Sequence, residues 1–233
     1  MRTSWRSEWP HWVLLGGMFA LAAAAWSGAP ERIPVHWGLS GNVDGYGGRF
    51  EGLFAIPLLA LGTYVLMLFL PRLDPGRANY ESFGPVYATL RLLMVAVLAA
   101  LYGLVHLWIR GVHARIEVFV PLIVGALFMV VGNLLGKVRP NWFVGIRTPW
   151  TLSSKVSWDG THRAGRWVFI LMGALLMAST VLRPASTAWV LGALLFAGVL
   201  GLTIYSYVLW RRDPEKTPPA GTLPAGDGRS GER

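Results

Sequence analysis

The sequence contains no cysteine and few charged residues. Asp, Glu, Lys and Arg make up 14% of its 233 residues and hydrophobic residues make up 54%, whereas an ordinary globular chain carries ~25% charged residues. The absence of cysteine excludes disulfides, thiolate catalysis and thiolate metal sites. The few charges are also unevenly placed and leave six long stretches of the chain uncharged. These stretches exclude most soluble enzymes.

Each uncharged stretch is about as long as a membrane-spanning helix, which needs ~20 residues to cross a bilayer core of ~30 Å. We therefore predict an all-α polytopic membrane protein, a bundle of six transmembrane helices with a structured outer loop and a structured inner loop. One membrane domain covers residues 1–212, and a Pro- and Gly-rich cytoplasmic tail at 213–233 is predicted to be disordered. The predicted spans are approximately 12–28, 53–70, 86–109, 118–136, 167–182 and 188–210.

The basic residues predict which side of the membrane each loop faces. If both termini are cytoplasmic, 15 of the 21 Lys and Arg residues fall on the cytoplasmic side, as the positive-inside rule favours. The net charge of +9 then reflects topology rather than nucleic-acid binding, which would need one water-facing basic patch. A cleaved signal peptide is the alternative interpretation of the first span, because small residues follow it at 27–29.

Ionisable residues are sparse inside the predicted spans. No acidic residue lies in any of them, which argues against carboxylate proton relays and intramembrane aspartyl proteolysis. Arg91 and His106 lie near span ends, where we expect them to snorkel towards the interface or to cap the helix. Small residues four positions apart, such as Gly132 and Gly136, favour close helix packing within the bundle or in a dimer, so the oligomeric state stays open.

The predicted outer loop begins with an extended segment and continues through a glycine-rich turn. Apolar residues alternate with Pro and His over 33–37, which predicts a brief extended segment with one apolar face. One His and one Asp are too few for a metal site, so we expect His36 and Asp44 to hydrogen-bond loop backbone. Alternatively, the loop is a recognition surface with Trp37 and Tyr46 as amphipathic anchors for a peptide lying on the membrane.

The predicted inner loop, residues 137–166, is rich in basic and aromatic residues. Its charges can hold it against anionic lipid, and four tryptophans in or beside it suit the headgroup layer. A serine would cap a short amphipathic helix that lies at the membrane interface. Trp158, His162 and Gly165 would lie on one face of this helix. Asp159 would pair with Arg163 on that helix.

Side chains of the inner loop are more varied than membrane anchoring requires. Arg147, His162 and Arg163 could bind a phosphate or carboxylate. We predict no catalytic or metal-binding residues and no cofactor, because the sequence has no metalloprotease, nucleophile-elbow or complete phosphate-loop motif. His36 is expected outside and His162 inside, so these two residues cannot share a site.

Both loops resemble motifs of a known family. Residues 33–49, Ile-Pro-Val-His-Trp-Gly-Leu-Ser-Gly-Asn-Val-Asp-Gly-Tyr-Gly-Gly-Arg, resemble the outer-loop motif of the SdpI family of bacterial membrane proteins. Residues 133–165, which include Gly-Ile-Arg-Thr-Pro-Trp-Thr-Leu, resemble its inner-loop motif. The resemblance implies a multipass protein of the bacterial cytoplasmic membrane that protects against a secreted peptide toxin. It implies membrane lipids, that toxin and a small helix-turn-helix repressor, held at the membrane, as partners, without direct nucleic-acid contact.

The motifs also indicate which positions of this chain would bind a ligand or partner. In the outer loop these are His36, Trp37, Asp44 and Tyr46, and in the inner loop they are Asn133, Asn141, Arg147, Thr148, Trp150, Trp158, Thr161, His162 and Arg163. The chain departs from the family pattern at Gly38, Arg49, Lys155 and Arg166. Lys155 stands where acids are common, and this reversal of charge weakens any inference of repressor binding most.

Two functions of other classes stay open. A membrane enzyme acting on lipid or peptide would use His162 as an acid or base beside Arg147 and Arg163. A transporter would use Arg91 as its buried charge, although the absence of acids from the spans argues against transport.

Overall fold

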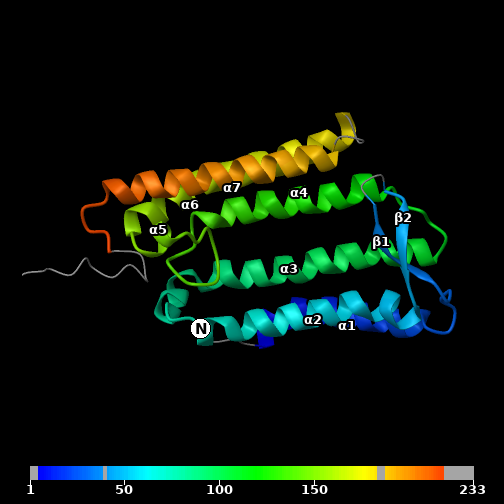
Figure 1. Ribbon diagram of the computed structural model, residues 1–233. Coiled ribbons are helices and arrows are strands. Elements are labelled where there is room, and N and C mark those ends of the chain that lie inside the picture. The colour runs from blue at the N-terminus through cyan, green and yellow to red at the C-terminus, as the bar shows by residue number, and fades with distance from the viewer. Residues whose placement is uncertain (1–4, 39–40, 183–186, 218–233) are drawn as a thin grey trace, which may run out of the picture.

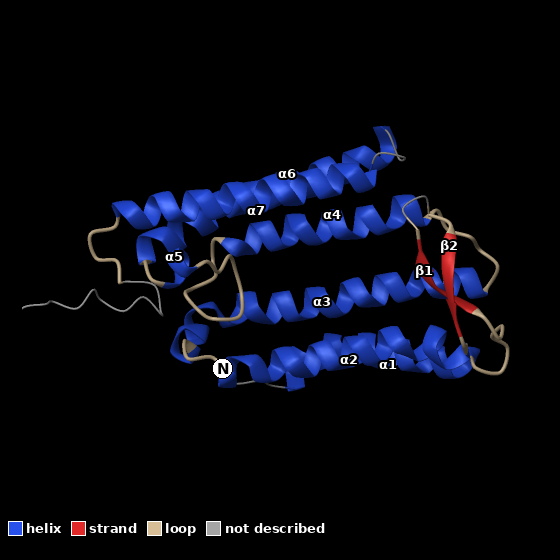
Figure 2. Ribbon diagram, viewed as in Figure 1, coloured by secondary structure: helices blue, strands red, loops and turns tan. Residues whose placement is uncertain are grey.

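The computed structural model describes residues 5–38, 41–182 and 187–217, which form an elongated bundle of long helices (Figure 1). The hairpin β1–β2 lies at one end of the bundle, and the short helix α5 lies at the other (Figure 2). In chain order the elements are α1 (Trp5–Ala25), β1 (Ile33–Trp37), β2 (Val43–Gly47), α2 (Arg49–Leu73), the 3-10 helix η1 (Arg77–Asn79), α3 (Tyr80–Ile109), α4 (Ile116–Leu135), α5 (Pro149–Leu152), α6 (Lys155–Leu182) and α7 (Thr187–Arg212).

Five of these helices are long and apolar enough to cross a membrane: α2, α3, α4, α6 and α7. The first predicted span corresponds to α1, which has 21 residues but does not belong to this group. Its first turns carry Glu8 and His11, and their polarity lowers the mean hydropathy of the helix. The count of six spans therefore stays a prediction.

Each long helix begins before the apolar stretch that predicted it, although α1 and α4 end at Ala25 and Leu135 rather than at 28 and 136. The largest difference is in α6, which begins at Lys155 rather than 167, so the predicted interfacial helix and the fifth span are one continuous helix. Helix α3 begins at Tyr80 rather than 86 and has a non-helical backbone at Phe83 (φ −129°, ψ 22°). A charge-free stretch locates the middle of a helix but not its ends, because a helix can continue through polar residues that pack against protein.

The outer loop adds a two-stranded antiparallel sheet to the predicted all-α fold. Ile33 pairs with Gly47 and His36 with Gly45, with a register shift between Pro34 and His36. The shift interrupts the alternation of the strand. Ile33 and Pro34 are consequently both buried and Val35 is exposed, so the prediction of one apolar face is wrong at Val35.

Glycines allow α4 and α6 to approach closely, which confirms the predicted close packing for Gly132. A Cβ atom on Gly132 would lie 2.8 Å from the carbonyl oxygen of Arg166, and one on Gly125 would lie 2.8 Å from that of Gly173. Side chains at these positions would separate the helices, so α4 and α6 pack backbone to backbone. Gly136 has open space around it and takes no part in this contact.

Two clusters of buried side chains make up the core of the bundle. The first joins α1, α2 and α3 to Ile33 of β1. The second contains Tyr80, Phe83, Tyr87, Val138 and Trp158. The two predicted functional loops pack on these clusters, the hairpin on the first and the inner loop on the second.

Candidate functional site

The hairpin is fixed to the bundle through β1. Ile33 is fully buried in a cluster with Leu53 and Tyr102. Gly52 makes room for it, since a Cβ atom there would lie 2.5 Å from the Ile33 Cβ. Trp37 is half-buried against the same cluster. Trp37, which we predicted to contact a peptide, therefore also holds the hairpin on the bundle.

A histidine and an aspartate lie in contact on the exposed face of the hairpin. His36 Nδ1 lies 2.5 Å from Asp44 Oδ1, and the side chains are 71% and 51% exposed. We expected both to bond loop backbone, and instead they pair with each other across the strands. Gly45 faces His36 in the register, and a Cβ atom on Gly45 would lie 2.9 Å from that of His36. A larger residue at position 45 would push the strands apart at this pair.

Tyr46 connects the hairpin to the end of α3. Its ring centroid lies 6.4 Å from that of Trp108 in a T-shaped arrangement, and the Arg32 guanidinium lies 5.2 Å from the ring. Tyr46 remains 46% exposed. We call His36, Asp44 and Tyr46 the hairpin patch. It offers an aromatic ring and a polar pair to a molecule at this end of the bundle.

At the opposite end, Trp158 is a structural centre rather than a headgroup anchor. The side chain is fully buried, and its Nε1–H donates to the Val138 carbonyl oxygen at 3.1 Å. Its ring stacks on that of His162 with centroids 4.1 Å apart. The predicted shared face of Trp158, His162 and Gly165 is confirmed, since all three are buried. The prediction that Trp158 lies among headgroups is wrong, because the indole finds its acceptor inside the protein.

His162 uses both ring nitrogens in bonds to the backbone. Nδ1 lies 2.8 Å from the Trp158 carbonyl oxygen, which can accept but not donate, so Nδ1 carries the proton. The Ile146 N–H donates to Nε2 at 3.1 Å. Gly145 (φ +112°) passes directly over the ring, where a Cβ atom would meet Nε2. The ring is therefore neutral and 1% exposed, which argues against a role as acid, base or phosphate ligand.

Asn141 joins the inner loop to the turn between α2 and α3. Its Oδ1 accepts from two backbone N–H groups of the loop, at 2.9 and 2.6 Å. The Tyr80 hydroxyl lies 3.4 Å from the same oxygen and donates to Asp74 at 2.8 Å. Asp74 also accepts from the Trp142 N–H at 3.0 Å. We call Asp74, Tyr80 and Asn141 the polar bridge, which connects segments more than 60 positions apart.

Thr148 and Trp150 attach α5 to α7. The Thr148 hydroxyl oxygen accepts from the Thr151 N–H at 3.1 Å and lies 3.0 Å from the Ser206 hydroxyl. The ring centroid of Trp150 lies 5.2 Å from that of Tyr207. Both residues therefore position the inner loop, and each is half-buried.

Arg147 and Arg163 are exposed members of the predicted inner set, as is Asn133. Arg147 donates to the Trp142 carbonyl oxygen at 2.5 Å. The predicted pair of Asp159 with Arg163 is wrong, because Asp159 pairs with Lys155 at 2.7 Å instead. Exposed Arg147 and Arg163 and buried His162 do not form the joint anion site that we considered.

Asn133 and Thr161 complete the predicted inner set, and they differ in exposure. Asn133 Oδ1 accepts from Arg166 at 3.4 Å. Thr161 is fully buried, and its hydroxyl has no hydrogen-bond partner within the described residues. The structure thus divides the inner set into buried members, such as Thr161, and exposed members, such as Asn133.

The chain after α7 also belongs to this end of the bundle. The Ser154 hydroxyl donates to Asp213 at 2.5 Å, and the Thr217 N–H donates to the Ser153 carbonyl oxygen at 3.0 Å. The hydrogen bond from Ser154 lowers the pKa of the Asp213 carboxyl below its usual value. Residues 213–217 of the predicted disordered tail thus pack against the inner loop, and 218–233 lie outside the described residues.

A buried ion pair between α1 and α3 escaped the sequence prediction. Arg91 is 1% exposed and donates to Glu8, whose side chain is 8% exposed. The Tyr64 hydroxyl, from α2, donates to the same carboxylate at 3.1 Å, and His11 Nδ1 lies 3.3 Å from it. The expectation that Arg91 snorkels towards the interface is therefore wrong. Glu8 was the available signal, but it precedes the predicted start of the first span at 12.

Among the residues that the structure describes, no three side chains of His, Asp or Glu gather closely enough to hold a metal ion.

Comparisons with known proteins agree with the loop motifs. Residues 137–208 match the SdpI/YfhL protein family, and residues 13–61 match a domain of unknown function (DUF1648). The chain is 24% identical over 184 residues to the immunity protein SdpI of Bacillus subtilis (strain 168), which covers 78% of this chain and 86% of that protein. No solved structure gives a significant match. The family match over residues 137–208, the similarity over most of the chain and the five helices apolar enough to cross a membrane identify a membrane protein similar to the SdpI/YfhL family.

Proposed function

We propose that this protein is an immunity protein that protects a bacterial cell against a secreted antimicrobial peptide. The observation that carries the proposal is the similarity to the immunity protein SdpI, which extends over 78% of this chain and 86% of that protein. If both termini are cytoplasmic, the hairpin faces the side from which a secreted peptide arrives.

The hairpin patch is the surface that we propose for contact with the peptide. It combines the exposed Tyr46 ring with the His36–Asp44 pair on a hairpin that Ile33 holds rigidly to the bundle. Aromatic residues supply contact area at little cost in conformational entropy, and they carry much of the binding energy of interfaces. An amphipathic peptide on the membrane surface would meet both an apolar and a polar group here.

Expression in a peptide-sensitive bacterium tests this proposal. The full chain should raise survival in the presence of the peptide, and His36→Ala with Tyr46→Ala should remove most of that gain. His113→Ala is a matched control, because His113 is an exposed histidine near the same end of the bundle. Equal amounts of each variant in the membrane must be verified. Full protection by the double variant would exclude the hairpin patch from peptide contact.

The inner end is the surface that we propose for a cytoplasmic partner, a small helix-turn-helix repressor held at the membrane. Arg147 and Arg163 support this, because they are exposed beside a rigid core of Trp158 and His162. A fluorescent fusion of a small repressor encoded beside this gene should move to the membrane only when the peptide is present. Arg147→Ala with Arg163→Ala should abolish recruitment and leave survival unchanged. Recruitment by that variant at the unmodified level would contradict this part of the proposal.

An enzyme that uses His162 is less well supported. Its two ring nitrogens are occupied by backbone groups, so proton transfer to a substrate would require the loop at Gly145 to move away.

A further inference from the structure

A cleft of about 580 Å³ lies between the end of α2 and the start of α3. Arginines from both helices and from η1 line it: Arg72, Arg77 and Arg91. Leu68 and Pro71 form an apolar part of the wall. The cleft belongs neither to the hairpin patch nor to the inner loop.

The buried arginine of the cleft has an unused donor. Arg91 is 1% exposed and gives its Nη2 to Glu8, but its Nε has no hydrogen-bond partner among the described residues. An unpaired buried N–H is unfavourable, because it has lost its bonds to water without gaining others. An acceptor bound in the cleft would relieve this penalty.

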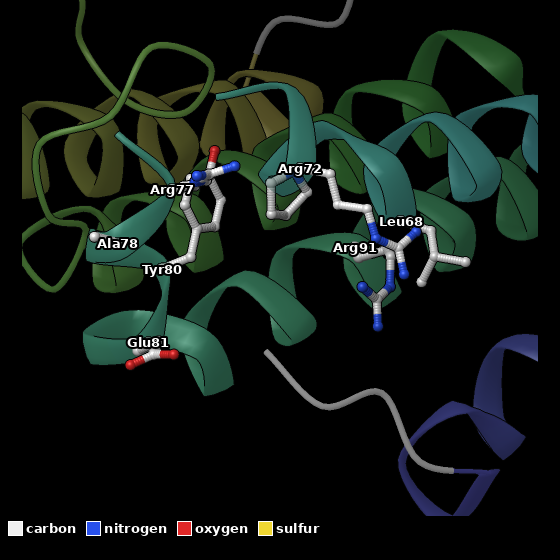
Figure 3. Close-up of a pocket in the computed structure, with 8 residues that line it drawn as sticks. Leu68, Arg72, Arg77, Ala78, Tyr80, Glu81 and Arg91 are labelled. Carbon is white, nitrogen blue, oxygen red and sulfur yellow. The ribbon is translucent and has the colours of Figure 1, made fainter. Parts of the chain in front are cut away.

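The other two arginines are exposed and available. Neither Arg72 nor Arg77 forms an ion pair within the described residues. Figure 3 shows the Arg72 and Arg91 guanidinium groups next to each other, with the carboxylate of Glu81 well away from them. Glu81 is the one acidic residue in the lining, and Arg91 is paired with Glu8, so Arg72 and Arg77 are the lining arginines whose charge no ion pair offsets within the described residues.

We propose that this cleft binds a phosphate group, held by Arg72 and the Nε–H of Arg91, while Arg77 lies beside Tyr80 in the wall of the same cleft (Figure 3). Planar guanidinium groups donate two parallel bonds to phosphate oxygens, which makes arginine well suited to this anion. The Arg91–Glu8 pair is retained on binding, because Nη2 and Nε are separate donors. This inference does not depend on the proposed immunity function.

The position of the cleft favours the headgroup of an anionic phospholipid as the source of the phosphate. Helix α2 has its apolar span within Arg49–Leu73, and Arg72 lies in its last turn. A lipid phosphate lies at this depth, where Leu68 and Pro71 would contact the start of an acyl chain. Basic pockets between transmembrane helices bind such headgroups. A soluble phosphate ester offers the same chemistry without the chain.

Thermal unfolding of the purified full chain in detergent tests the proposal, with phosphatidylglycerol, phosphatidylcholine and inorganic phosphate as separate additions. Phosphatidylglycerol should raise the unfolding midpoint, and Arg72→Gln with Arg77→Gln should weaken its apparent affinity by about tenfold or more. Arg110→Gln with Arg115→Gln, two exposed arginines at the hairpin end, should leave the affinity unchanged.

The additions distinguish the two sources of phosphate. An arginine-dependent shift with phosphatidylglycerol alone identifies a lipid site, and one that inorganic phosphate reproduces identifies a site for a soluble phosphate. The proposal is wrong if neither phosphatidylglycerol nor inorganic phosphate shifts the unfolding midpoint. It is also wrong if each shifts the midpoint of the double variant Arg72→Gln with Arg77→Gln as much as that of the unmodified chain. Should that double variant not fold, Arg72→Gln alone, with retained lipid counted by native mass spectrometry, is judged by the same criterion.

Discussion

Loss of either partner of the buried Glu8–Arg91 pair should destabilise the bundle strongly. The pair joins α1 to α3, with side chains 8% and 1% exposed, so removal of one partner leaves the other charge buried without compensation. Breaking such a pair typically costs ~3–5 kcal/mol, and at ~3 kcal/mol the folding equilibrium shifts ~150-fold. Glu8→Gln is the sharper variant, because glutamine still accepts from the Tyr64 hydroxyl while the charge is gone.

The two single variants should differ in magnitude. Glu8→Gln leaves a guanidinium that cannot lose its proton, whereas Arg91→Gln leaves a carboxylate that can take one up. Neutralisation limits the cost of the second variant, so Glu8→Gln should be the less stable of the two. The double variant buries no charge, and its loss should be smaller than the sum of the single losses.

The assay is unfolding of each purified variant in mixed micelles, followed by the fluorescence of the 12 tryptophans. Lys155→Gln provides the control, because it breaks an exposed pair with Asp159 in which Lys155 is 81% exposed. Its cost should stay below ~0.5 kcal/mol. Single losses at Glu8 and Arg91 no larger than this control, or a double loss equal to their sum, would refute the reasoning that these charges are buried and coupled.

Three further predictions concern the inner end and the topology. Gly145→Ala should cost ~1–3 kcal/mol of stability because of the positive φ at this position, and more because the new methyl group would contact His162. The control Gly62→Ala, which has open space around it in α2, should cost nothing. Equal unfolding midpoints of the two variants would exclude backbone strain at position 145. Asp213→Asn should lower the unfolding midpoint at pH 7. Because the pKa of Asp213 is lowered from 3.8, its carboxylate stabilises the fold above pH 3.8 and loses this effect as the pH falls through the folded pKa. The midpoints of the variant and the unmodified chain should therefore converge in acid, and a constant difference from pH 7 to pH 3 would contradict this role of Asp213. A membrane-impermeant maleimide should label His36→Cys in intact cells and exposed Arg163→Cys only after permeabilisation, and the reverse pattern would invert the predicted topology.

Local features of the sequence predicted much of the fold. Runs without charge locate the apolar middle of each helix, since charges are costly in a bilayer. Of the two glycines singled out in the predicted fourth span, Gly132 packs closely against α6 and Gly136 does not. The alternation after Ile33 indicated a strand, although the register shift at Pro34 and the partner strand were not visible in it.

Contacts between distant segments could not be predicted in the same way. Glu8 and Arg91 are 83 positions apart, and no local pattern connects them. Trp158 and His162 were correctly placed on one face of a helix, but an amphipathic pattern does not reveal whether that face meets lipid or protein. Here the face meets Val138 and the loop at Gly145, so residues expected to bind partners instead hold the loop in place.

The glycine contact between α4 and α6 has a mechanical consequence. Two rods whose backbones touch at Gly125, Gly132 and Gly173 bend together and resist bending more than either rod alone. No lipid chain or small molecule can wedge between them, because even a single methyl group on either surface would collide with the other helix. A relative movement of α4 and α6 would have to break these backbone contacts, whereas α3 and α4 are in less extensive contact with each other.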